Sequence, residues 1–484
     1  MIVLFHPRST RPKNRRLPLS VLHLAAMLEG REEYEIVDGN ADPDPWATID
    51  ALAQRGQLDM LGVSVMPGPQ LRAAIPVCKA FREKYPRVPI VWGGYFASLY
   101  TEAVLNAKYV DFVVKGQGEE TLIELLEALR GRRDFSRIRG LAYKDQFGFH
   151  VYTAERPLKA PDEFPWLPYH RLDPAKYIAR TFLGSRTAVH QASVGCPFRC
   201  NFCGVVPVYD REKMESPART EAILDHLQLN YGINAVQFYD NNFFLREDHA
   251  VELADRIQRL KLKWWCEARV DIVLGYSDET LRKLKAAGCT MIFFGVESGS
   301  DAVLRDMKKQ LTAEQTIELA RRIRQFGIVP EYSLIFGNPE NAGQDVTENI
   351  AFARKIKQVN PDVESVVQTY VPTPQRNGAF GGVDVAFPRT PDEWVLDQWY
   401  KLLIRTDPDL PWLPPQVRRQ IRDFETVINS RWPTTQDMRL PPWGRAMLQT
   451  LSSWRYAMGA YGFPAELRLA QKLVRLREPR LESL

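Results

Sequence analysis

Strand-like and helix-like segments alternate along most of this chain, and this alternation restricts the fold more than any other feature. Over residues 1 to about 130, apolar runs such as MIVLF, EYEIVD and MLGVSV are separated by segments with helical periodicity. A second series of expected strands covers 187–194, 234–240, 263–270, 290–298, 328–337 and 364–372. Such alternation is typical of parallel α/β sheets. The sequence therefore predicts an N-terminal doubly wound sheet and a central partial TIM barrel of six β/α units.

The segments between and after these two units differ in character. An expected hairpin, GLAYKDQFGFHVY, and a proline-rich passage, APDEFPWLP, lie before the second unit. After residue 372 the chain is rich in Pro, Trp and Arg and indicates helices with loops. We expect four parts: a Rossmann-like domain over 1–135, a linker with a hairpin over 136–185, the partial barrel over 186–372, and a mainly helical substrate or cap domain over 373–484.

The distribution of apolar and charged residues indicates in which cellular compartment the protein resides. No run approaches the roughly 20 apolar residues of a membrane-spanning helix, and the apolar N-terminus precedes its basic residues, the wrong order for a secretory signal. We expect a cytoplasmic protein. From Pro415 to Leu484 the chain holds 12 Lys/Arg and 6 Asp/Glu, a net +6. This excess favours an acidic partner or a membrane surface, and a solvated helical surface is the alternative interpretation.

Three of the six cysteines crowd into the stretch SVGCPFRCNFCG, as Cys196, Cys200 and Cys203. This stretch follows the first expected barrel strand, so it lies at the carboxyl end of the barrel, where such folds gather their chemistry. Thiolates are soft ligands that suit iron–sulfur clusters. Three ligands for a four-iron cluster leave one iron open. A zinc site would need a fourth ligand, and the nearest, His226, lies on an expected helix.

The spacing C-x3-C-x2-C, with an aromatic residue before the last cysteine, resembles the radical S-adenosylmethionine (SAM) superfamily. The resemblance extends to about residue 372: FYDNNF (238–243) is similar to the second-strand motif, GVESGS (295–300) to the fourth-strand motif and IFGNPEN (335–341) to the fifth-strand glycine motif. It implies a [4Fe-4S] cluster on the three cysteines and SAM bound at the open iron. The SAM-binding residues that it implies are Phe202, Asp240, Asn241, Glu267, Arg269, Glu297, Ser298, Asn338 and Val371.

Two of these assignments have alternatives. In WWCEARVD, period-2 alternation puts Trp265, Glu267 and Arg269 on one face. Opposite charges on one face either point into a polar interior or form a structural ion pair. Asp240, Asn241 and Asn242 follow a strand, so they are either SAM contacts or turn formers.

The first unit also carries a resemblance. VWGGYFAS followed by VDFVVKGQGEETLIELLEAL is similar to the cobalamin-binding domain that precedes the barrel in many radical SAM enzymes. The cobalamin-binding residues that it implies are Asn40, Ser64, Gly93, Gly94, Gly116, Gly118 and Glu119. The histidine that ligates cobalt in D-x-H-x-x-G proteins is absent at Asp38-Gly39-Asn40, so we expect no histidine axial ligand. A degenerate domain without cobalamin is the alternative, and we expect His23 to be a core or surface residue.

The domain order implies a cobalamin-dependent radical SAM enzyme, most simply a C-methyltransferase. The cluster would cleave SAM to a 5′-deoxyadenosyl radical, and the substrate radical would take a methyl group from methylcobalamin. Alternatives are a cyclase, ring-contraction or carbon–carbon coupling enzyme acting on a lipid or tetrapyrrole-like substrate, or a non-catalytic cobalamin or redox sensor. The expected partners are a small-molecule or lipid-like substrate and an external flavodoxin- or ferredoxin-like electron donor. We expect no nucleic acid, and peripheral membrane contact through the basic, Trp-rich C-terminus.

Overall fold

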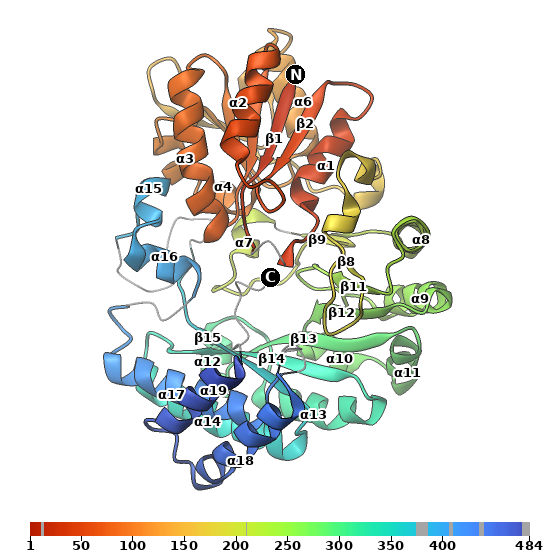
Figure 1. Ribbon diagram of the computed structural model, residues 1–484, viewed down its shortest axis with the longest axis vertical. Coiled ribbons are helices and arrows are strands. Elements are labelled where there is room, and N and C mark those ends of the chain that lie inside the picture. The colour runs from red at the N-terminus through yellow and green to blue at the C-terminus, as the bar shows by residue number, and fades with distance from the viewer. Residues whose placement is uncertain (11–13, 210, 374–385, 406–409, 435–439, 477–484) are drawn as a thin grey trace.

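The computed structural model describes residues 1–10, 14–209, 211–373, 386–405, 410–434 and 440–476. Its N-terminal part is a seven-stranded sheet in the order β2-β1-β3-β4-β5-β6-β7 (Figure 1). The strands are β1 (Ile2–His6), β2 (Tyr34–Asp38), β3 (Met60–Ser64), β4 (Ile90–Gly93), β5 (Phe112–Val114), β6 (Leu141–Lys144) and β7 (His150–Tyr152). The first five are parallel, as the alternation predicted.

Two layers of helices cover this sheet. The helices are α1 (Leu19–Leu28), α2 (Pro45–Arg55), α3 (Pro69–Lys84), α4 (Gly94–Leu99), α5 (Thr101–Asn106) and α6 (Glu119–Leu129). One sheet face packs on α1 and α6 through residues such as Val21 and Leu125, and the other buries Trp92 against α3, which contributes Phe81. Capping residues mark where helices begin. At the start of α2, for example, the side chain of Asp44 accepts the backbone N–H of Ala47.

The hairpin that we assigned to a linker instead continues the N-terminal sheet. β6 pairs antiparallel with β5, and β7 pairs antiparallel with β6. An edge strand leaves unpaired backbone groups, and this hairpin extends the sheet beyond β5. The residues after it run through short turns to the central unit.

The central unit is a six-stranded parallel sheet in the order β15-β14-β13-β12-β11-β8. Its strands are β8 (Thr187–His190), β11 (Ala235–Phe238), β12 (Lys263–Ala268), β13 (Cys289–Glu297), β14 (Val329–Phe336) and β15 (Glu364–Thr369). Its helices are α8 (Pro217–Tyr231), α9 (Glu247–Ile257), α10 (Val270–Gly275), α11 (Asp278–Ala286), α12 (Asp301–Asp306), α13 (Ala313–Ile323) and α14 (Ala342–Val359). The expected fold class, a doubly wound domain before a partial (β/α)6 barrel and a helical C-terminus, is confirmed.

One expected strand is wrong in detail. The segment 187–194 is two strands, because β8 ends at His190 and β9 (Ser193–Gly195) pairs antiparallel with β10 (Glu212–Met214) in a separate ribbon. The short helix α7 (Val205–Val208) lies between β9 and β10. The cysteine loop is thus held by a two-stranded ribbon rather than by the end of a long barrel strand.

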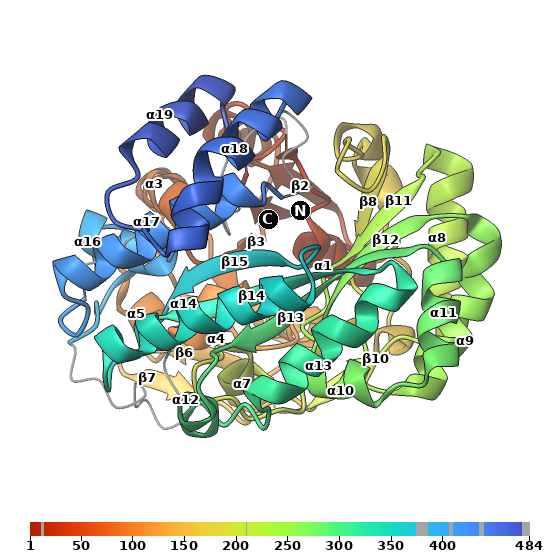
Figure 2. The ribbon, with the colours of Figure 1, turned by 90° about the horizontal axis from the view of Figure 1, so that it is seen from below.

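The C-terminal helices form two groups (Figures 1 and 2). α15 (Pro391–Trp394) and α16 (Asp397–Leu403) lie beside α3 and α4, where Trp394 packs on Tyr100 at a ring distance of 4.6 Å. α17 (Pro415–Arg431), α18 (Pro442–Met458) and α19 (Ala465–Val474) pack beside α14. None of the described helices combines the length and the apolar character that crossing a bilayer would require.

Candidate active site

The three clustered cysteines lie on the loop between β9 and α7. Gly195 opens this loop with φ of +85°, and a Cβ there would collide with the carbonyl oxygen of Arg211 on the facing strand. Only glycine fits such a close backbone approach. Cys200 is buried, and Cys196 and Cys203 are half-buried. Burial raises the pKa of Cys196 to about 11 and also raises that of Cys203.

A cationic side chain faces the cysteine loop. Nη1 of Arg269 lies 3.7 Å from the Sγ atom of Cys200, and its guanidinium stacks on the ring of Phe198 at 3.6 Å. Arg269 also pairs with Asp271 at 3.0 Å, so its charge has a partner other than Glu267. The guanidinium of Arg269 thus donates toward a sulfur atom of the cysteine loop.

The donor set suits an iron–sulfur cluster. Three soft sulfur ligands come from one loop, with one iron of a four-iron cluster left for an exogenous ligand. Among the described residues, no three His, Cys, Asp or Glu side chains already converge on one metal-binding point. The fit of Cys196, Cys200 and Cys203 therefore rests on their shared loop and their chemistry.

A group of acids comes from the end of β12, the loop after β11 and the start of β10. Both carboxylate oxygens of Asp240 and both of Glu212 are buried without a hydrogen-bond partner in the described chain. Burial raises the pKa of Asp240 to about 7. Ser193 and Ala192 lie near the carboxylate and partly offset this rise in the pKa, but neither makes a hydrogen bond of ordinary geometry with it. Burial and the neighbouring Asp240 raise the pKa of Glu212, and that of Glu267, to about 8.

These acids fit a cationic ligand. Buried polar atoms are almost always hydrogen-bonded in folded proteins, so a cluster of unpartnered ones indicates a ligand. The side-chain amide of Asn242 is also buried and has no partner among the described residues. The ammonium and sulfonium groups of SAM are the charges that Asp240, Glu212 and Glu267 would neutralise. Sequence reasoning missed Glu212, and it placed Asn242 after the strand without choosing it as a SAM contact.

The fourth-strand motif is occupied by internal contacts. Glu297 has φ of +68° and follows a register shift in β13, so its side chain turns toward Lys309, whose Nζ lies 2.6 Å from Oε1. Ser298 is fully buried and donates to Asn349 at 3.2 Å. Oε1 of Glu297 thus already accepts from a lysine and is not free for a ligand.

The fifth-strand motif is held by a buried carboxylate. Oδ2 of Asp345 accepts the backbone N–H of Gly337 at 2.7 Å and that of Asn338 at 3.3 Å. Burial raises the pKa of Asp345 to about 6. Asn338 is buried, and Val371 lies buried beyond the end of β15.

The structure brings the expected SAM-contacting residues to the carboxyl edge of the central sheet. One of them differs from the others in its exposure to solvent. Asn241 is exposed, and its neighbour Asn242 is buried instead. The backbone carbonyl of Phe202 accepts from Thr373 at 2.9 Å, which ties the cysteine loop to the segment after β15.

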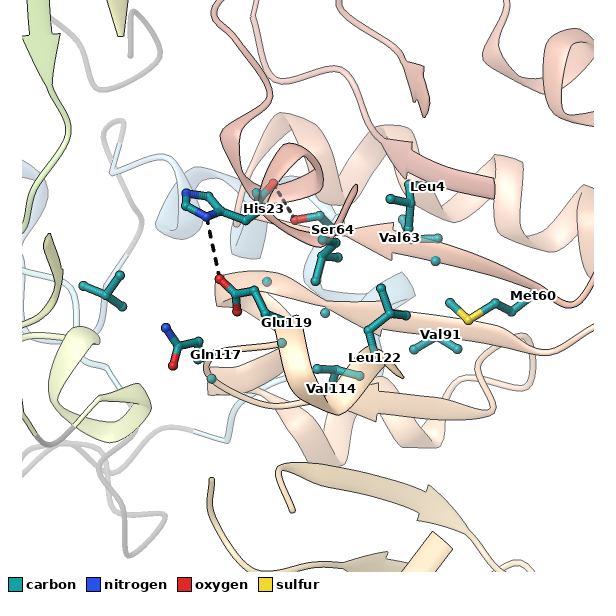
Figure 3. A pocket seen from close by; sticks show the side chains of 18 of the residues that line it. Leu4, His23, Met60, Val63, Ser64, Val91, Val114, Gln117, Glu119 and Leu122 are labelled. Atoms are coloured by element: carbon teal, nitrogen blue, oxygen red, sulfur yellow. Dashed lines mark hydrogen bonds and ion pairs between the residues drawn. The ribbon is translucent and has the colours of Figure 1, made fainter. Parts of the chain in front are cut away.

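A cavity of about 160 Å³ opens at the carboxyl edge of the N-terminal sheet and runs between the sheet and helices α1 and α6 (Figure 3). Six of the expected cobalamin residues line it: Ser64, Gly93, Gly94, Gly116, Gly118 and Glu119. The central unit contributes Gln191, Val194 and Tyr209 to its mouth. The edges of both sheets therefore border one space.

His23 also lines this cavity, where we expected a core or surface residue. Its Nδ1 lies 3.7 Å from Oε1 of Glu119. Burial lowers the pKa of His23 to about 4, so its imidazole is largely neutral near pH 7, and burial raises the pKa of Glu119 to about 7. The helical pattern LSVLHLAAML gives no sign that His23 faces a cavity.

Asn40 does not line the cavity. Its Oδ1 accepts the backbone N–H groups of Ser9 and Thr10, both at 2.9 Å. Its Nδ2 donates to Asp38, which accepts from Tyr177 at 2.8 Å. The side chain is thus used to hold the loop after β1.

The comparisons with known families agree with this geometry. The Radical SAM superfamily model matches residues 191–353, and the B12 binding domain model matches residues 11–126. The chain is a radical SAM protein with an N-terminal B12-binding domain. The first range contains the cysteine loop and the buried acids, and the second contains most of the cavity lining.

Several known proteins are similar to this chain. The radical SAM chain is 29% identical over 344 residues to an uncharacterized methyltransferase of Pyrococcus horikoshii, covering 70% of this chain and 73% of the relative. It is 24% identical to the anaerobic magnesium-protoporphyrin IX monomethyl ester cyclase of Synechocystis, covering 77% and 74%. Among solved structures, the methyltransferase TsrM of Kitasatospora setae superposes with a TM-score of 0.68 at 18% identity and 98% coverage of both chains. The enzyme OxsB superposes with a TM-score of 0.63 at 21% identity, covering 72% of this chain and 51% of its own.

Proposed function

We propose that the protein is a cobalamin-dependent radical SAM enzyme that methylates an unactivated carbon. One observation carries the proposal: the cysteine loop, the unpartnered acids and the cavity of the B12-binding domain meet at two facing sheet edges. Tyr95 of α4 lies against Gly204, directly after Cys203, and the side chain of Tyr209 reaches the cavity. When bound, the cluster, SAM and cobalamin supply radical formation and methyl transfer.

The residue roles follow from the contacts. Cys196, Cys200 and Cys203 would hold the cluster, and Arg269 would screen its charge from the side of Cys200. Asp240, Glu267 and Glu212 would bind the cationic end of SAM. The neighbouring Asn338, Ser298, Glu297, Phe202, Val371 and the more exposed Asn241 would line the rest of the SAM site. These side chains orient the cofactors and exclude water, and no general base is needed for hydrogen-atom abstraction.

His6, at the end of β1, would not ligate cobalt. The only histidine at the end of β1, His6, has Nδ1 2.9 Å from Asp38 and Nε2 2.8 Å from Gln70. Both ring nitrogens are engaged, so His6 has no lone pair to offer a metal. Gly93, Gly94, Gly116 and Gly118 would let the flat macrocycle approach the backbone, beside Ser64 and Glu119. Asn40 would shape this site only through the loop that it holds.

A cyclase is the second candidate, and it is favoured by the relative in Synechocystis. The two are distinguished by anaerobic reconstitution with iron, sulfide and hydroxocobalamin, followed by reductant and labelled SAM. Methyl transfer predicts 5′-deoxyadenosine, S-adenosylhomocysteine and a product heavier by one methyl group. A cyclase predicts 5′-deoxyadenosine alone and a product that has lost hydrogens. We propose a small, apolar or lipid-like substrate and a flavodoxin- or ferredoxin-like electron donor.

We also propose a cytoplasmic enzyme that rests on an anionic membrane surface through α18 and α19. Apolar side chains follow one face of α18 at helical spacing: Trp443 is 63% exposed, Trp454 53% and Met458 78%. Gly444 of α18 lies against Val474 of α19, so the helices run antiparallel. Further exposed apolar residues are Leu451, Phe463, Leu469 and Leu473. Residues 440–475 hold five Lys/Arg and one acid, Glu466, a composition typical of interfacial helices.

Vesicle binding tests the membrane proposal. Wild-type protein should sediment with vesicles that contain phosphatidylglycerol and less with pure phosphatidylcholine. Trp443→Ser with Trp454→Ser should abolish most of this binding. Phe147→Ser with Phe149→Ser, on an equally exposed hairpin of the N-terminal sheet, is the matched control and should bind as wild type. Equal loss in both double variants, or no vesicle binding by the wild type, would contradict the proposal.

A further inference from the structure

The cavity of the B12-binding domain changes character with depth. Figure 3 shows His23, Ser64, Gln117 and Glu119 toward the mouth, on the side of the central unit. Toward the closed end the labelled side chains are all apolar: Leu4, Met60, Val91, Val114 and Leu122. A ligand that fits the cavity must therefore have a polar part at the mouth and an apolar part at the closed end.

The closed end is built from one face of the sheet and one helix. Leu4, Met60, Val91 and Val114 come from β1, β3, β4 and β5, and each is at most 7% exposed. Leu122 of α6 covers them from the other side. No side chain with a hydrogen-bond donor or acceptor lies among these residues, and the paired strands use their own backbone groups. A polar atom placed there would lose its water without gaining a partner.

The floor of the cavity also depends on a missing side chain. A Cβ on Gly62 would lie 3.1 Å from Cε of Met60 and 3.2 Å from Cδ2 of Leu4. Because both neighbours already approach so closely, any larger residue would fill the space from below. Gly62 thus preserves room for a thin ligand between the sheet and Leu122.

The mouth is polar in a way that suits a sugar. Oγ of Ser64 lies 2.9 Å from Oγ of Ser20, and Glu119 lies beside His23 with a carboxyl group whose pKa burial raises to about 7. Neutral acid, imidazole and hydroxyl groups accept and donate hydrogen bonds without demanding a charge. They match ribose hydroxyls, and they lie outside the apolar end.

We propose that this cavity selects corrinoids by their lower nucleotide base and takes an apolar benzimidazole in preference to a purine. This inference rests on the proposed cobalamin site and goes beyond it, because it assigns base selectivity to Leu4, Met60, Val91, Val114 and Leu122. The methyl groups of dimethylbenzimidazole gain from apolar burial. The amino group and ring nitrogens of adenine would be buried without partners in the same place.

The expected selectivity is moderate. An apolar site discriminates against an added polar group by about 10- to 100-fold, since the misplaced group keeps part of its solvation. We therefore expect the wild-type protein to bind cobalamin about 10- to 100-fold more tightly than the corrinoid with an adenine base. Cobinamide, which lacks the nucleotide, should bind more weakly than cobalamin because nothing fills the cavity.

Binding titrations followed by the visible absorption of the corrinoid test the inference without any turnover. The probes are cobalamin, adeninyl cobamide and cobinamide, each added to the full chain under anaerobic conditions. Val91→Thr puts a hydroxyl group into the apolar end at nearly constant volume and should reduce the preference for cobalamin several-fold. Val113→Thr is the matched control, since Val113 lies on β5 but is buried on the opposite face of the sheet.

Each result has a meaning. A preference for cobalamin over both probes that shrinks in Val91→Thr and persists in Val113→Thr supports the inference. Equal affinity for cobalamin and adeninyl cobamide overturns it and leaves the proposed cobalamin site intact. Failure of all three corrinoids to bind overturns the inference and the cobalamin part of the proposed function together.

Discussion

Replacing Asp240 with asparagine tests whether the buried acids bind the cationic end of SAM. The Asp240 side chain is 1% exposed, lacks a hydrogen-bond partner in the described chain and has its pKa raised to about 7. With that pKa, about a tenth of the groups are ionised at pH 6 and about nine tenths at pH 8. Only the ionised form attracts a cation. Wild-type affinity for SAM should therefore rise about tenfold from pH 6 to pH 8 for each such carboxyl group that must lose its proton.

The variant should remove this pH dependence in part. Asparagine is neutral at every pH, so Asp240→Asn loses one charge-assisted contact. Such contacts contribute about 1.5–3 kcal/mol, which corresponds to roughly 10- to 150-fold weaker binding at pH 8. At pH 6 the wild-type carboxyl group is itself mostly neutral, and the difference between the two proteins should shrink to a few-fold. Glu267 and Glu212 keep a residual pH dependence, because the pKa of each is raised to about 8.

Equilibrium dialysis of labelled SAM against the reconstituted protein, at several pH values between 6 and 8.5, measures both effects. Glu119→Gln is the matched control, because Glu119 is also buried with its pKa raised to about 7 but lines the cavity of the other domain. Its SAM affinity should follow the wild-type curve. A wild-type affinity that is flat with pH, or a constant ratio between wild type and Asp240→Asn at all pH values, would refute the reasoning.

Three further variants probe the scaffold. Cys203→Ala should lower the iron and sulfide content after reconstitution. Cys78→Ala, which changes a buried cysteine of α3, should leave both unchanged. Gly195→Ala should destabilise the protein by about 1–3 kcal/mol or more in denaturant unfolding, because it forces a positive φ and a collision with the facing backbone. Gly343→Ala, which meets no atom within 4 Å, should stay within about 0.5 kcal/mol of wild type. Tyr177→Phe should cost about 1–3 kcal/mol by removing a partner of the buried Asp38, measured in the same way.

The periodicity of the sequence was enough to predict the order of strands and helices but not which strands pair. The hairpin at residues 141–152 has the alternation of any antiparallel pair, and nothing in it specifies the free edge of β5 as its partner. The segment 187–194 looks like one buried strand because the residues before and after Gln191 are both apolar. The chain leaves the sheet after His190, whose imidazole lies 2.7 Å from the carboxylate of Glu215, a contact between positions 25 residues apart.

The site was predictable where its chemistry lies in consecutive residues. The cysteine spacing and the acids after strands are local patterns, and the structure gathers them at one edge. Glu212 gave no local signal, since it lies in a short ribbon whose pairing with β9 depends on the tertiary fold. The exchange of Asn241 for Asn242 has a similar cause, because strand alternation stops at Phe238 and the turn decides which side chain points inward.

The two halves of the proposed site are joined by packing as well as by the chain. α7 follows Cys203 by one residue, and a Cβ on Gly204 would collide with the hydroxyl group of Tyr95 in the B12-binding domain. Gly116, after the end of β5, also lies near α7, because a Cβ there would be 3.7 Å from the carbonyl oxygen of Val208. Because α7 follows the cysteine loop and packs on Tyr95 and Gly116 of the B12-binding domain, close packing would fix the distance between the two proposed cofactor sites. A substrate carbon that must face both cofactors in turn requires such a fixed spacing, since a displacement of 1 Å can already cost about 100-fold in rate.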